Sequence, residues 1–226
     1  MAYRRTPAVQ ARLEAQARAI VHAAMKVLSE QGFGGLSMAT VAAEAGVATG
    51  TVYKSFRGKA ELVTAVFRDV VTREVAAVAQ AGADGGVVER VTAAVETFAG
   101  RALKNPKLAY VLLAEPVDAG VDTERLRFRR AFAETFESAI AEGVAAGRLP
   151  AQDPGTSAAA LVGAIGEVLV GPLAQQVQSE SVVPELVAFA LRALGVTDSA
   201  VTDSGRTDTH RTDIGAYEQE QSDAHP

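Results

Sequence analysis

One short segment of the chain gathers small hydroxyl, aromatic and basic side chains on a single predicted helix face. Its polar members are Thr49, Gly50, Thr51, Tyr53 and Lys54. Among them, Val52 and Phe56 are four residues apart, which is the spacing of an inward-facing apolar pair. Threonine and lysine side chains reach base edges, and tyrosine hydroxyls suit phosphate oxygens. This pattern predicts a helix whose exposed side reads duplex DNA.

The residues before this helix predict how it is held. Ser37 stands where a helix N-cap is expected, although no Glu or Gln at Thr40 completes a capping box. Gly46 then ends that first helix, because a left-handed turn conformation costs glycine little, and Val47 fills the corner. Two short helices joined in this way predict a helix-turn-helix, in which the second helix enters the major groove and the first crosses the DNA backbone.

Further DNA contacts are expected around the second helix. Ser37 and Thr40 lie on the first helix, beside the backbone it would cross. Lys59 begins a third helix, where its charge adds to backbone N–H groups that favour a phosphate. Arg4 and Arg5 belong to a short arm that either reaches the DNA or contacts nothing. The other interpretation of the segment is a tight corner in an all-helical protein, which does not account for the ordered polar residues.

In these residues the chain resembles the DNA-binding domain of the TetR family of one-component bacterial regulators. The matching positions, spread over residues 20–62, are Ile20, Gly32, Phe33, Ser37, Val41, Ala42, Ala45, Gly46, Val47, Gly50, Thr51, Val52, Tyr53, Phe56, Lys59 and Leu62. The departures are Ala48 and Gly58, where serines are common, and Ser37, where a threonine is common. The resemblance implies an all-α homodimer with an N-terminal reading head and a C-terminal domain that binds a small molecule of unknown identity.

Charge is divided unevenly along the chain. Residues 1–60 carry eight Lys or Arg and three Glu, a net charge of +5. The rest of the chain carries 14 basic and 24 acidic residues, a net charge of −10. A basic head on an acidic body is expected where only one end of a protein meets phosphate.

Composition argues against several other classes of protein. There is no cysteine, and His22, His210 and His225 are too scattered for a metal cluster. No phosphate-binding glycine loop, nucleophile elbow or zinc-protease motif is present, so we predict no catalytic residue, no metal and no cofactor other than a small-molecule effector. No run of 18 or more apolar residues and no hydrophobic signal region occurs, which predicts a soluble, cytoplasmic protein without membrane contact.

The remaining pattern predicts an all-α fold. The expected helices cover residues 7 to about 31, 37–45, 49–56, 60–80, 87–104, 106–115, 122–146 with Asp122 as cap, 154–178 and 183–194. We expect a DNA-binding domain at 1–60, a ligand-binding and dimerisation domain at 61–196, and an acidic low-complexity tail at 197–226. Thr-Asp recurs every five residues in the tail and matches no calcium loop, so the tail is predicted to be disordered.

Apolar stripes on the last two predicted helices are rich enough for a core and for a partner subunit. The predicted dimer contacts are Leu161, Ile165, Leu169, Leu173, Leu186, Leu191 and Leu194. Two-fold pairing fits the symmetry of repeated DNA half-sites. The alternative, in which these stripes only close the core of a monomer, stays open.

Five of the twelve aromatic side chains fall on three consecutive predicted helices, which indicates a mostly apolar cavity for a small apolar or amphipathic ligand. The predicted lining residues are Phe98, Leu103, Tyr110, Leu113, Phe128, Phe132 and Phe136, with Tyr110, Glu115 or Glu167 as polar anchors. Arg125 or Arg129 could meet an acidic ligand. Ordinary core packing is the alternative for each aromatic residue taken alone.

Together these features predict a DNA-binding transcriptional regulator. We expect a repressor that binds a palindromic operator as a homodimer and is released by a ligand, with the helix from Ala60 as the coupling element. Two alternatives remain: an enzyme on an all-α scaffold, and an interaction or ligand-buffering protein that keeps the head without a specific operator.

Overall fold

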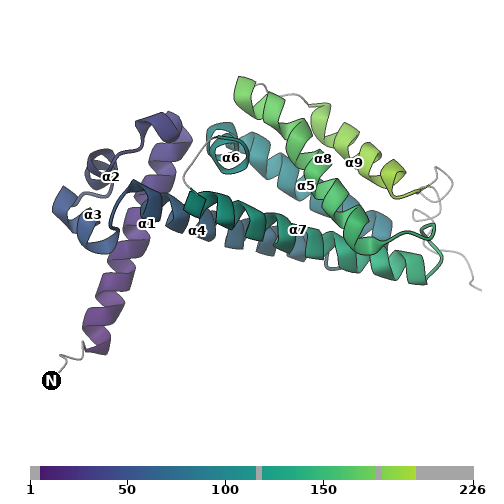
Figure 1. The fold of residues 1–226 in the computed structure, drawn as a ribbon, viewed down its shortest axis with the longest axis horizontal. Helices are drawn as coiled ribbons and strands as arrows, with labels where there is room; N and C mark the ends of the chain where they lie inside the picture. Colours follow the sequence, from purple (N-terminus) through teal and green to yellow (C-terminus); the bar gives the residue numbers. More distant parts are fainter. Residues whose placement is uncertain (1–5, 116–118, 177–179, 197–226) are drawn as a thin grey trace, which may run out of the picture. The chain divides into compact units, whose positions relative to one another are not determined.

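The computed structural model describes residues 6–115, 119–176 and 180–196. These residues form α-helices without strands, so the predicted all-α fold is confirmed (Figure 1). The helices are α1 (Pro7–Gly35), α2 (Met38–Glu44), α3 (Thr49–Ser55), α4 (Lys59–Ala81), α5 (Val87–Lys104), α6 (Pro106–Leu113), α7 (Ala119–Ala145), α8 (Pro154–Gln175) and α9 (Val182–Ala193). The predicted arm at 1–5 and tail at 197–226 lie outside the described residues.

Three helices begin in the same way, with a capping side chain followed by proline. Thr6 Oγ1 accepts a hydrogen bond from Val9 N at 3.4 Å before α1, and Asp153 Oδ1 accepts one from Thr156 N at 2.8 Å before α8. Asn105 Oδ1 accepts from Leu108 N at 3.4 Å before α6. Proline suits the next position because the first helical N–H groups have no partner within the helix.

Two helix starts differ from the sequence-based expectation. The structure forms a capping box at α2 without Glu or Gln, because the Thr40 hydroxyl accepts the Ser37 N–H at 2.9 Å while Ser37 Oγ accepts Thr40 N–H at 3.0 Å. Asp122 does not cap α7. That helix begins at Ala119, and Asp122 lies in its first turn, 3.1 Å from Arg125.

The first helix continues past its predicted end near Gly32. At Gly32 the backbone leaves the helical conformation (φ 68°, ψ −171°), and the helix resumes to Gly35 with a kink. A positive φ costs little only for glycine, so the residue that was expected to end the helix bends it instead.

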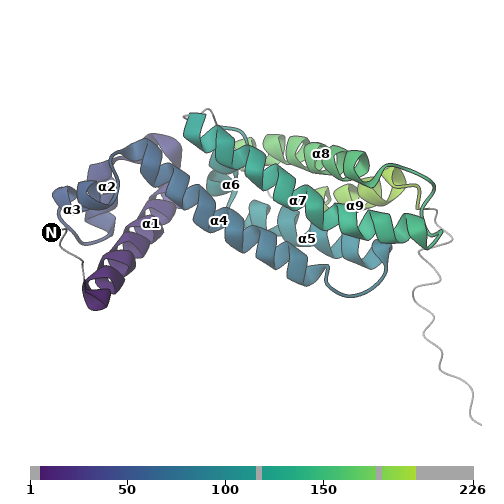
Figure 2. The ribbon, with the colours of Figure 1, turned by 60° about the horizontal axis from the view of Figure 1, so that its bottom comes forward.

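Helices α1, α2 and α3 pack together at the beginning of α4, and α5 and α7 pack along the rest of it (Figure 1). Helix α8 packs against α7, and α9 packs against α5. The head formed by α1–α3 has a core of fully buried Ile20, Leu28, Val41 and Val52. The body consists of α5–α9 and the rest of α4, and in it α7 lies between α4 and α8 (Figure 2). The helix α4 therefore belongs to both packing groups.

Six of the seven predicted dimer contacts are buried inside their own chain. Leu161, Ile165, Leu169, Leu173, Leu186 and Leu194 are each at most 2% exposed, and Leu191 is half-buried. Side chains buried within their own chain have no surface left for a partner. The apolar side chains that remain exposed on these helices are others, notably Val168 on α8 and Phe189 on α9, which are 49% and 42% exposed.

Among the described residues, α8 is the one helix long and apolar enough to cross a membrane, with a mean hydropathy of 1.7. This finding rests on length and composition alone. The unbroken apolar runs on which the sequence-based expectation rested do not include α8, because Glu167 interrupts its apolar sequence. On average the helix is nevertheless apolar. Ile165 and Leu169 are fully buried inside the chain, while 28% of the apolar window of α8 as a whole is buried.

A buried carboxylate joins α4 to α7. Glu124 is 7% exposed, and its Oε1 accepts hydrogen bonds from Arg68 Nη2 at 2.7 Å and from Arg127 Nη1 at 2.9 Å. The hydrogen bond from Arg68 is the main cause that holds the pKa of Glu124 below its ordinary value. Because the pKa is lower in the folded chain, this group stabilises the fold above pH 4.5, its ordinary value, and the contribution is lost as the pH falls below it.

We therefore expect Glu124→Gln to lower the free energy of unfolding by about 1 kcal/mol at neutral pH, since hydrogen bonds to a charged acceptor are stronger than neutral ones. The difference from the unmodified protein should shrink as the pH falls below 4.5. Urea unfolding at a series of pH values measures it, with exposed Glu134→Gln as control. A difference that does not change with pH would contradict the role given to this carboxylate.

Candidate functional site

The polar side of α3 is uncovered. Thr49, Gly50, Tyr53 and Lys54 are exposed, Thr51 is half-buried, and the opposite side buries Val52 completely in the head core. The Tyr53 ring, at 54% exposure, is among the most exposed large apolar groups of the described residues. Gly46 (φ 66°) makes the turn that sets α3 against α2. This arrangement presents a short polar helix that no other described part of the chain covers.

Ser37 and Thr40 make hydrogen bonds within the head. Besides the capping box, Thr40 Oγ1 lies 3.0 Å from the carbonyl oxygens of Gly35 and Ser37. These contacts fix the start of α2 to the end of α1. Ser37 is exposed and Thr40 half-buried, so the Thr40 hydroxyl acts first as a structural group in this conformation.

Lys59 is also engaged within the chain. Its Nζ donates to the carbonyl oxygen of Phe33 at 3.0 Å and lies 3.8 Å from the centre of the Phe33 ring. The ammonium group thus satisfies a carbonyl next to the Gly32 kink and makes a cation–π contact. Lys59 ties the start of α4 to the end of α1. Arg4 and Arg5, the other predicted basic contacts, lie outside the described residues.

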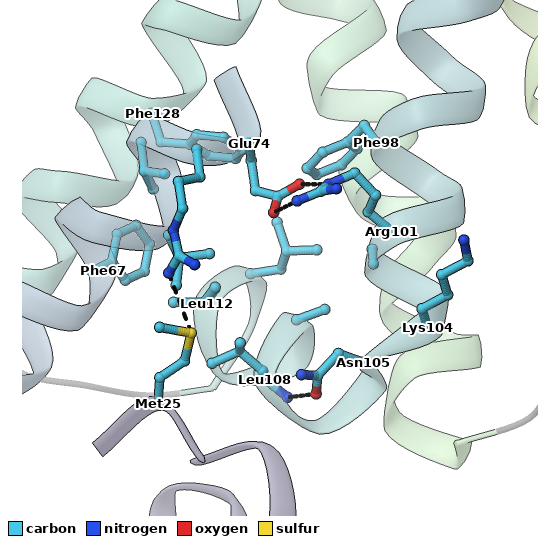
Figure 3. Close-up of a pocket in the computed structure, with 16 residues that line it drawn as sticks. Met25, Phe67, Glu74, Phe98, Arg101, Lys104, Asn105, Leu108, Leu112 and Phe128 are labelled. Atoms are coloured by element: carbon cyan, nitrogen blue, oxygen red, sulfur yellow. Dashed lines mark hydrogen bonds and ion pairs between the residues drawn. The ribbon is translucent and has the colours of Figure 1, made fainter. Parts of the chain in front are cut away.

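A first cavity of about 300 Å³ opens in the body where α4, α5, α6 and α7 meet (Figure 3). Its walls are mostly apolar and are built by Phe67, Val70, Val71, Phe98, Ala102, Leu108, Ala109, Leu112, Leu113 and Phe128. Met25 of α1 also borders it, so a side chain of the head helps to enclose a cavity of the body. Cavities of this size and lining are typical of small-molecule sites.

One edge of the first cavity is strongly polar. Arg101 on α5 and Glu74 on α4 form a two-bond ion pair, with Arg101 Nε and Nη2 donating to Glu74 at 2.6 and 2.8 Å (Figure 3). The hydrogen bond to Glu74 raises the pKa of Arg101. Arg73 and Lys104 also line the cavity. Within the described part of the chain, Arg73 is paired with Asp69, whereas no ion pair or hydrogen bond holds the exposed Lys104.

A second cavity of about 310 Å³ lies between α5, α7 and α8. It is lined by Phe98, Leu113, Ala114, Phe128, Arg129, Phe132, Val162, Gly163, Gly166, Glu167 and Val170. Phe98, Leu113 and Phe128 belong to the walls of both cavities. The ring centres of Phe98 and Phe128 are 5.9 Å apart, and those of Phe98 and Phe132 are 4.6 Å apart.

The predicted ligand residues fall into three groups. Phe98, Leu113 and Phe128 line both cavities, and Phe132 and Glu167 line the second one. Leu103, Tyr110 and Phe136 line neither: Phe136 packs edge-on against Phe132 at 5.4 Å, and the other two are half-buried against the core. Arg125, considered for an acidic ligand, donates instead to backbone carbonyls, while Arg129 lines the second cavity.

Several lining residues were not predicted from the sequence. The polar edge was missed, because Glu74 and Arg101 come from different helices and 27 sequence positions separate them. Asn105 lies between the helices expected at 87–104 and 106–115, and we predicted no ligand contact for it. The cap-plus-proline pattern of Asn105 and Pro106, which occurs at two other helix starts, was the available signal that Asn105 begins a helix beside the aromatic residues.

Helix α6 is fastened to the head at one end and to α7 at the other. At its start, Asn105 Nδ2 donates to Ser29 Oγ of α1 at 2.8 Å, and Lys107 Nζ donates to the Glu30 carbonyl oxygen at 2.7 Å. At its end, Arg125 of α7 donates to the carbonyl oxygens of Val111 at 2.7 Å and Leu112 at 2.9 Å. Asn105 also lines the first cavity (Figure 3), so one residue touches both the cavity and the head.

The described residues contain no group of three or more His, Cys, Asp or Glu side chains placed to hold a metal ion. The exposed side of α3 offers hydrogen-bonding and charged groups, and the first cavity offers apolar contact with a charged edge.

Comparison with known protein families gives two matches. A family model described as "Bacterial regulatory proteins, tetR family" matches residues 20–66, which contain α2 and α3. A second, described as "Tetracyclin repressor-like, C-terminal domain", matches residues 84–169, which contain most of the body. A comparison with curated proteins gave no match.

Several solved structures have a similar fold. The fatty acid degradation regulator FadR from Bacillus halodurans is 20% identical, with a TM-score of 0.69 over 83% of this chain and 96% of that one. FadR from Bacillus subtilis in complex with stearoyl-CoA is 18% identical, with a TM-score of 0.66 over 79% and 95%. RolR in complex with resorcinol is 16% identical, with a TM-score of 0.65 over 86% and 94%. At these identities the likeness concerns the fold.

The hydrogen bonds of Thr40 lead to a prediction about the head. Thr40→Val keeps the shape of the side chain but removes the hydroxyl of the capping box, so we expect the free energy of unfolding to fall by about 1 kcal/mol. Thr40→Ser retains the hydroxyl and should differ little from the unmodified protein. Chemical denaturation of both variants measures the effect. Equal stability of the two variants would show that the capping box does not hold the head.

Proposed function

The chain belongs to the TetR family of bacterial transcriptional regulators, and from this premise we propose that it is a repressor released from DNA by a small molecule. In this proposal a homodimer binds a palindromic operator through α3, and the ligand occupies the body. The domain division at residue 60 and the residue roles below are part of the same proposal. The single observation that carries it is Asn105, which borders the first cavity and is hydrogen-bonded to the head.

The uncovered side of α3 supports the DNA contact. Within the described part of the chain, Thr49, Tyr53 and Lys54 make no side-chain hydrogen bond or ion pair, so their polar groups are available to bases and phosphates. The N-terminal end of the second helix enters the major groove in this motif. We assign base contacts to Thr51 and Lys54 and a phosphate contact to Tyr53. Lys59, held by Phe33, positions α4 against α1 in this conformation.

The uncovered apolar groups of α8 and α9 support a homodimer. On α8, Gly163, Val168 and Gly171 are exposed, and on α9 Phe189 is exposed. Burying such groups against a second copy removes apolar surface from water, and the glycines allow two helices to approach closely. Two-fold pairing of four helices places two heads on one palindrome with half-sites about one helical turn apart or a small multiple of that.

The first cavity supports a ligand that is largely apolar and has one charged or polar end. Its wall is aliphatic and aromatic, and its polar edge holds Arg73, Arg101 and Lys104 against the single carboxylate of Glu74. Two proteins of similar fold have been solved with chemically different molecules, stearoyl-CoA and resorcinol, so the fold alone does not choose the ligand.

Helix α6 is the proposed coupling element, together with α4, which leaves the head at Lys59. A ligand that fills the first cavity contacts α6 along Leu108 and Leu112. The bonds from Asn105 and Lys107 to α1 then transmit any displacement of α6 to the head. DNA release follows if the ligand binds more tightly to the conformation whose heads no longer match the operator.

The proposal is tested by selecting genomic DNA fragments with the purified protein and by screening small molecules for their release. We expect Tyr53→Ala and Lys54→Ala to weaken binding to the selected fragment by about tenfold or more, because each removes a DNA contact, and to leave the dimer intact. Arg130→Ala, an exposed position of α7 with the same change in charge as Lys54→Ala, is the control. Fluorescence anisotropy and size-exclusion chromatography provide the two measurements.

Equal binding of selected and random DNA would instead favour a protein that retains the head without a specific operator. Failure to bind any genomic fragment at low salt, with no effector present, would contradict the proposal.

The coupling is tested by Ser29→Ala. This change removes the acceptor of Asn105 Nδ2 and leaves Asn105 Oδ1 free to cap α6. We expect about threefold or more effector to be needed for half-release of DNA, with direct effector binding nearly unchanged. The Ser29 hydroxyl also donates to the Met25 carbonyl oxygen at 2.9 Å, so the control is Thr135→Ala, which removes the corresponding bond from Thr135 to the Ala131 carbonyl oxygen on α7. An unchanged release curve for Ser29→Ala would exclude this route.

A further inference from the structure

We propose that the two cavities of the body form one elongated ligand site, closed in the middle by the side chains of Phe98, Phe128 and Leu113. The ligand class is a long apolar chain with an anionic headgroup. The headgroup binds at the polar edge of the first cavity, and the chain passes the aromatic side chains into the second cavity beside α8. This inference rests on the proposed function in that the same site carries the effector.

The partition between the cavities consists of side chains that both cavities share. Phe98 comes from α5, Phe128 from α7 and Leu113 from the end of α6. The Phe98 and Phe128 ring planes are tilted by 40° at a centre-to-centre distance of 5.9 Å, so these two rings do not stack face to face on each other, whereas Phe128 stacks on Phe132 at 5.6 Å. Rotation of these side chains joins the two spaces without moving a helix backbone. The joined site is narrow where the rings stood, which suits a chain rather than a broad ring system.

The volumes favour a long ligand. Each cavity is about 300 Å³, near the lower end of the range of roughly 300–1,000 Å³ for small-molecule pockets. Together they reach the middle of that range. A short apolar molecule fills the first cavity alone, whereas a chain of about 16 carbons continues into the second and buries more apolar surface for each added methylene.

The charges at the two ends set the direction of the ligand. At the first cavity, Arg101 is held by Glu74, and Lys104 lies exposed at the edge without a partner among the described residues (Figure 3). A carboxylate or phosphate headgroup satisfies Lys104 and competes with Glu74 for the two donors of Arg101. The second cavity has one cation and one anion, Arg129 and Glu167, and so no net preference for a charged group.

Glycines in α8 keep the second cavity open. Gly166 lines this cavity, and a Cβ atom added at Gly166 would meet nothing within 4 Å. Glycine inside a helix is less favourable than alanine by about 1 kcal/mol. The absence of a side chain is therefore not required by packing within the chain. It leaves space in which the end of a ligand chain can lie, and a larger side chain at Gly166 would occupy that space.

The test is calorimetric titration of the purified full-length protein with octanoate, palmitate, octanoyl-CoA and palmitoyl-CoA below their micelle concentrations. The free acids and the thioesters distinguish the two sources of an anionic headgroup. We expect one pair to bind, with the 16-carbon member at least about tenfold tighter than the 8-carbon member. Gly166→Leu fills the second cavity and should remove most of that difference while leaving the 8-carbon affinity unchanged. Gly166→Ala, which adds only the Cβ, is the matched control.

Equal affinity for the two chain lengths, a Gly166→Leu protein that binds the 16-carbon probe as the unmodified protein does, or no binding of any of the four probes would overturn the inference. Size-exclusion chromatography shows whether Gly166→Leu is still assembled as the unmodified protein is. If genomic DNA is selected and a short molecule releases it while none of these probes binds, the proposed function stands and the elongated site is wrong. If no DNA fragment is selected, the proposed function itself fails.

Discussion

The fixing of α6 at both ends is the constraint on which the rest of this account depends. Asn105 and Lys107 attach its start to α1, and Arg125 attaches its end to α7 through backbone carbonyls that the helix itself leaves without partners. The same short helix forms a wall of the first cavity. A change in the cavity is therefore resisted on the α7 side by several charge-assisted hydrogen bonds, and on the head side by two bonds at the helix start. The head side has one neutral bond, from Asn105, and one charge-assisted bond, from Lys107, whereas every bond on the α7 side comes from the charged Arg125.

The contacts made within the chain also determine which surfaces stay uncovered. In the head, Thr40 and Lys59 bind backbone oxygens and fix α1, α2 and α4 to one another, while Tyr53 and Lys54 on α3 are left for a partner. In the body, the large aliphatic side chains Leu161, Ile165, Leu169 and Leu173 of α8 face inward, while Gly163, Val168 and Gly171 are exposed. The polar helix α3 in the basic head and the apolar helix α8 in the acidic body thus each have an uncovered side. In the proposed function, nucleic acid contacts α3 and a second copy of the chain contacts α8.

Much of the fold could be predicted from local signals. The helices expected to begin at residues 7 and 154 begin there as α1 and α8, Gly46 placed the turn before α3, and the interval from Val87 to Lys104 was predicted as it stands. The rest depends on contacts that no local pattern encodes. The apolar stripe through Leu161 and Ile165 was predicted to face a partner, but periodicity shows only that a face is buried, not whether its own chain or another buries it. The polar edge of the cavity and the bond from Asn105 to Ser29 join residues far apart in sequence, and the Thr40 cap uses a hydroxyl where the usual pattern has a carboxylate.

The central claim is that a ligand in the body and DNA on α3 favour different arrangements of α6 and α1. The most direct measurement is the affinity of an effector for the protein alone and for the protein saturated with its selected operator fragment. Linkage requires operator DNA to weaken effector binding by the same factor by which the effector weakens DNA binding. We predict equal factors, each well above one. Effector affinity that is the same with and without operator DNA would contradict the account.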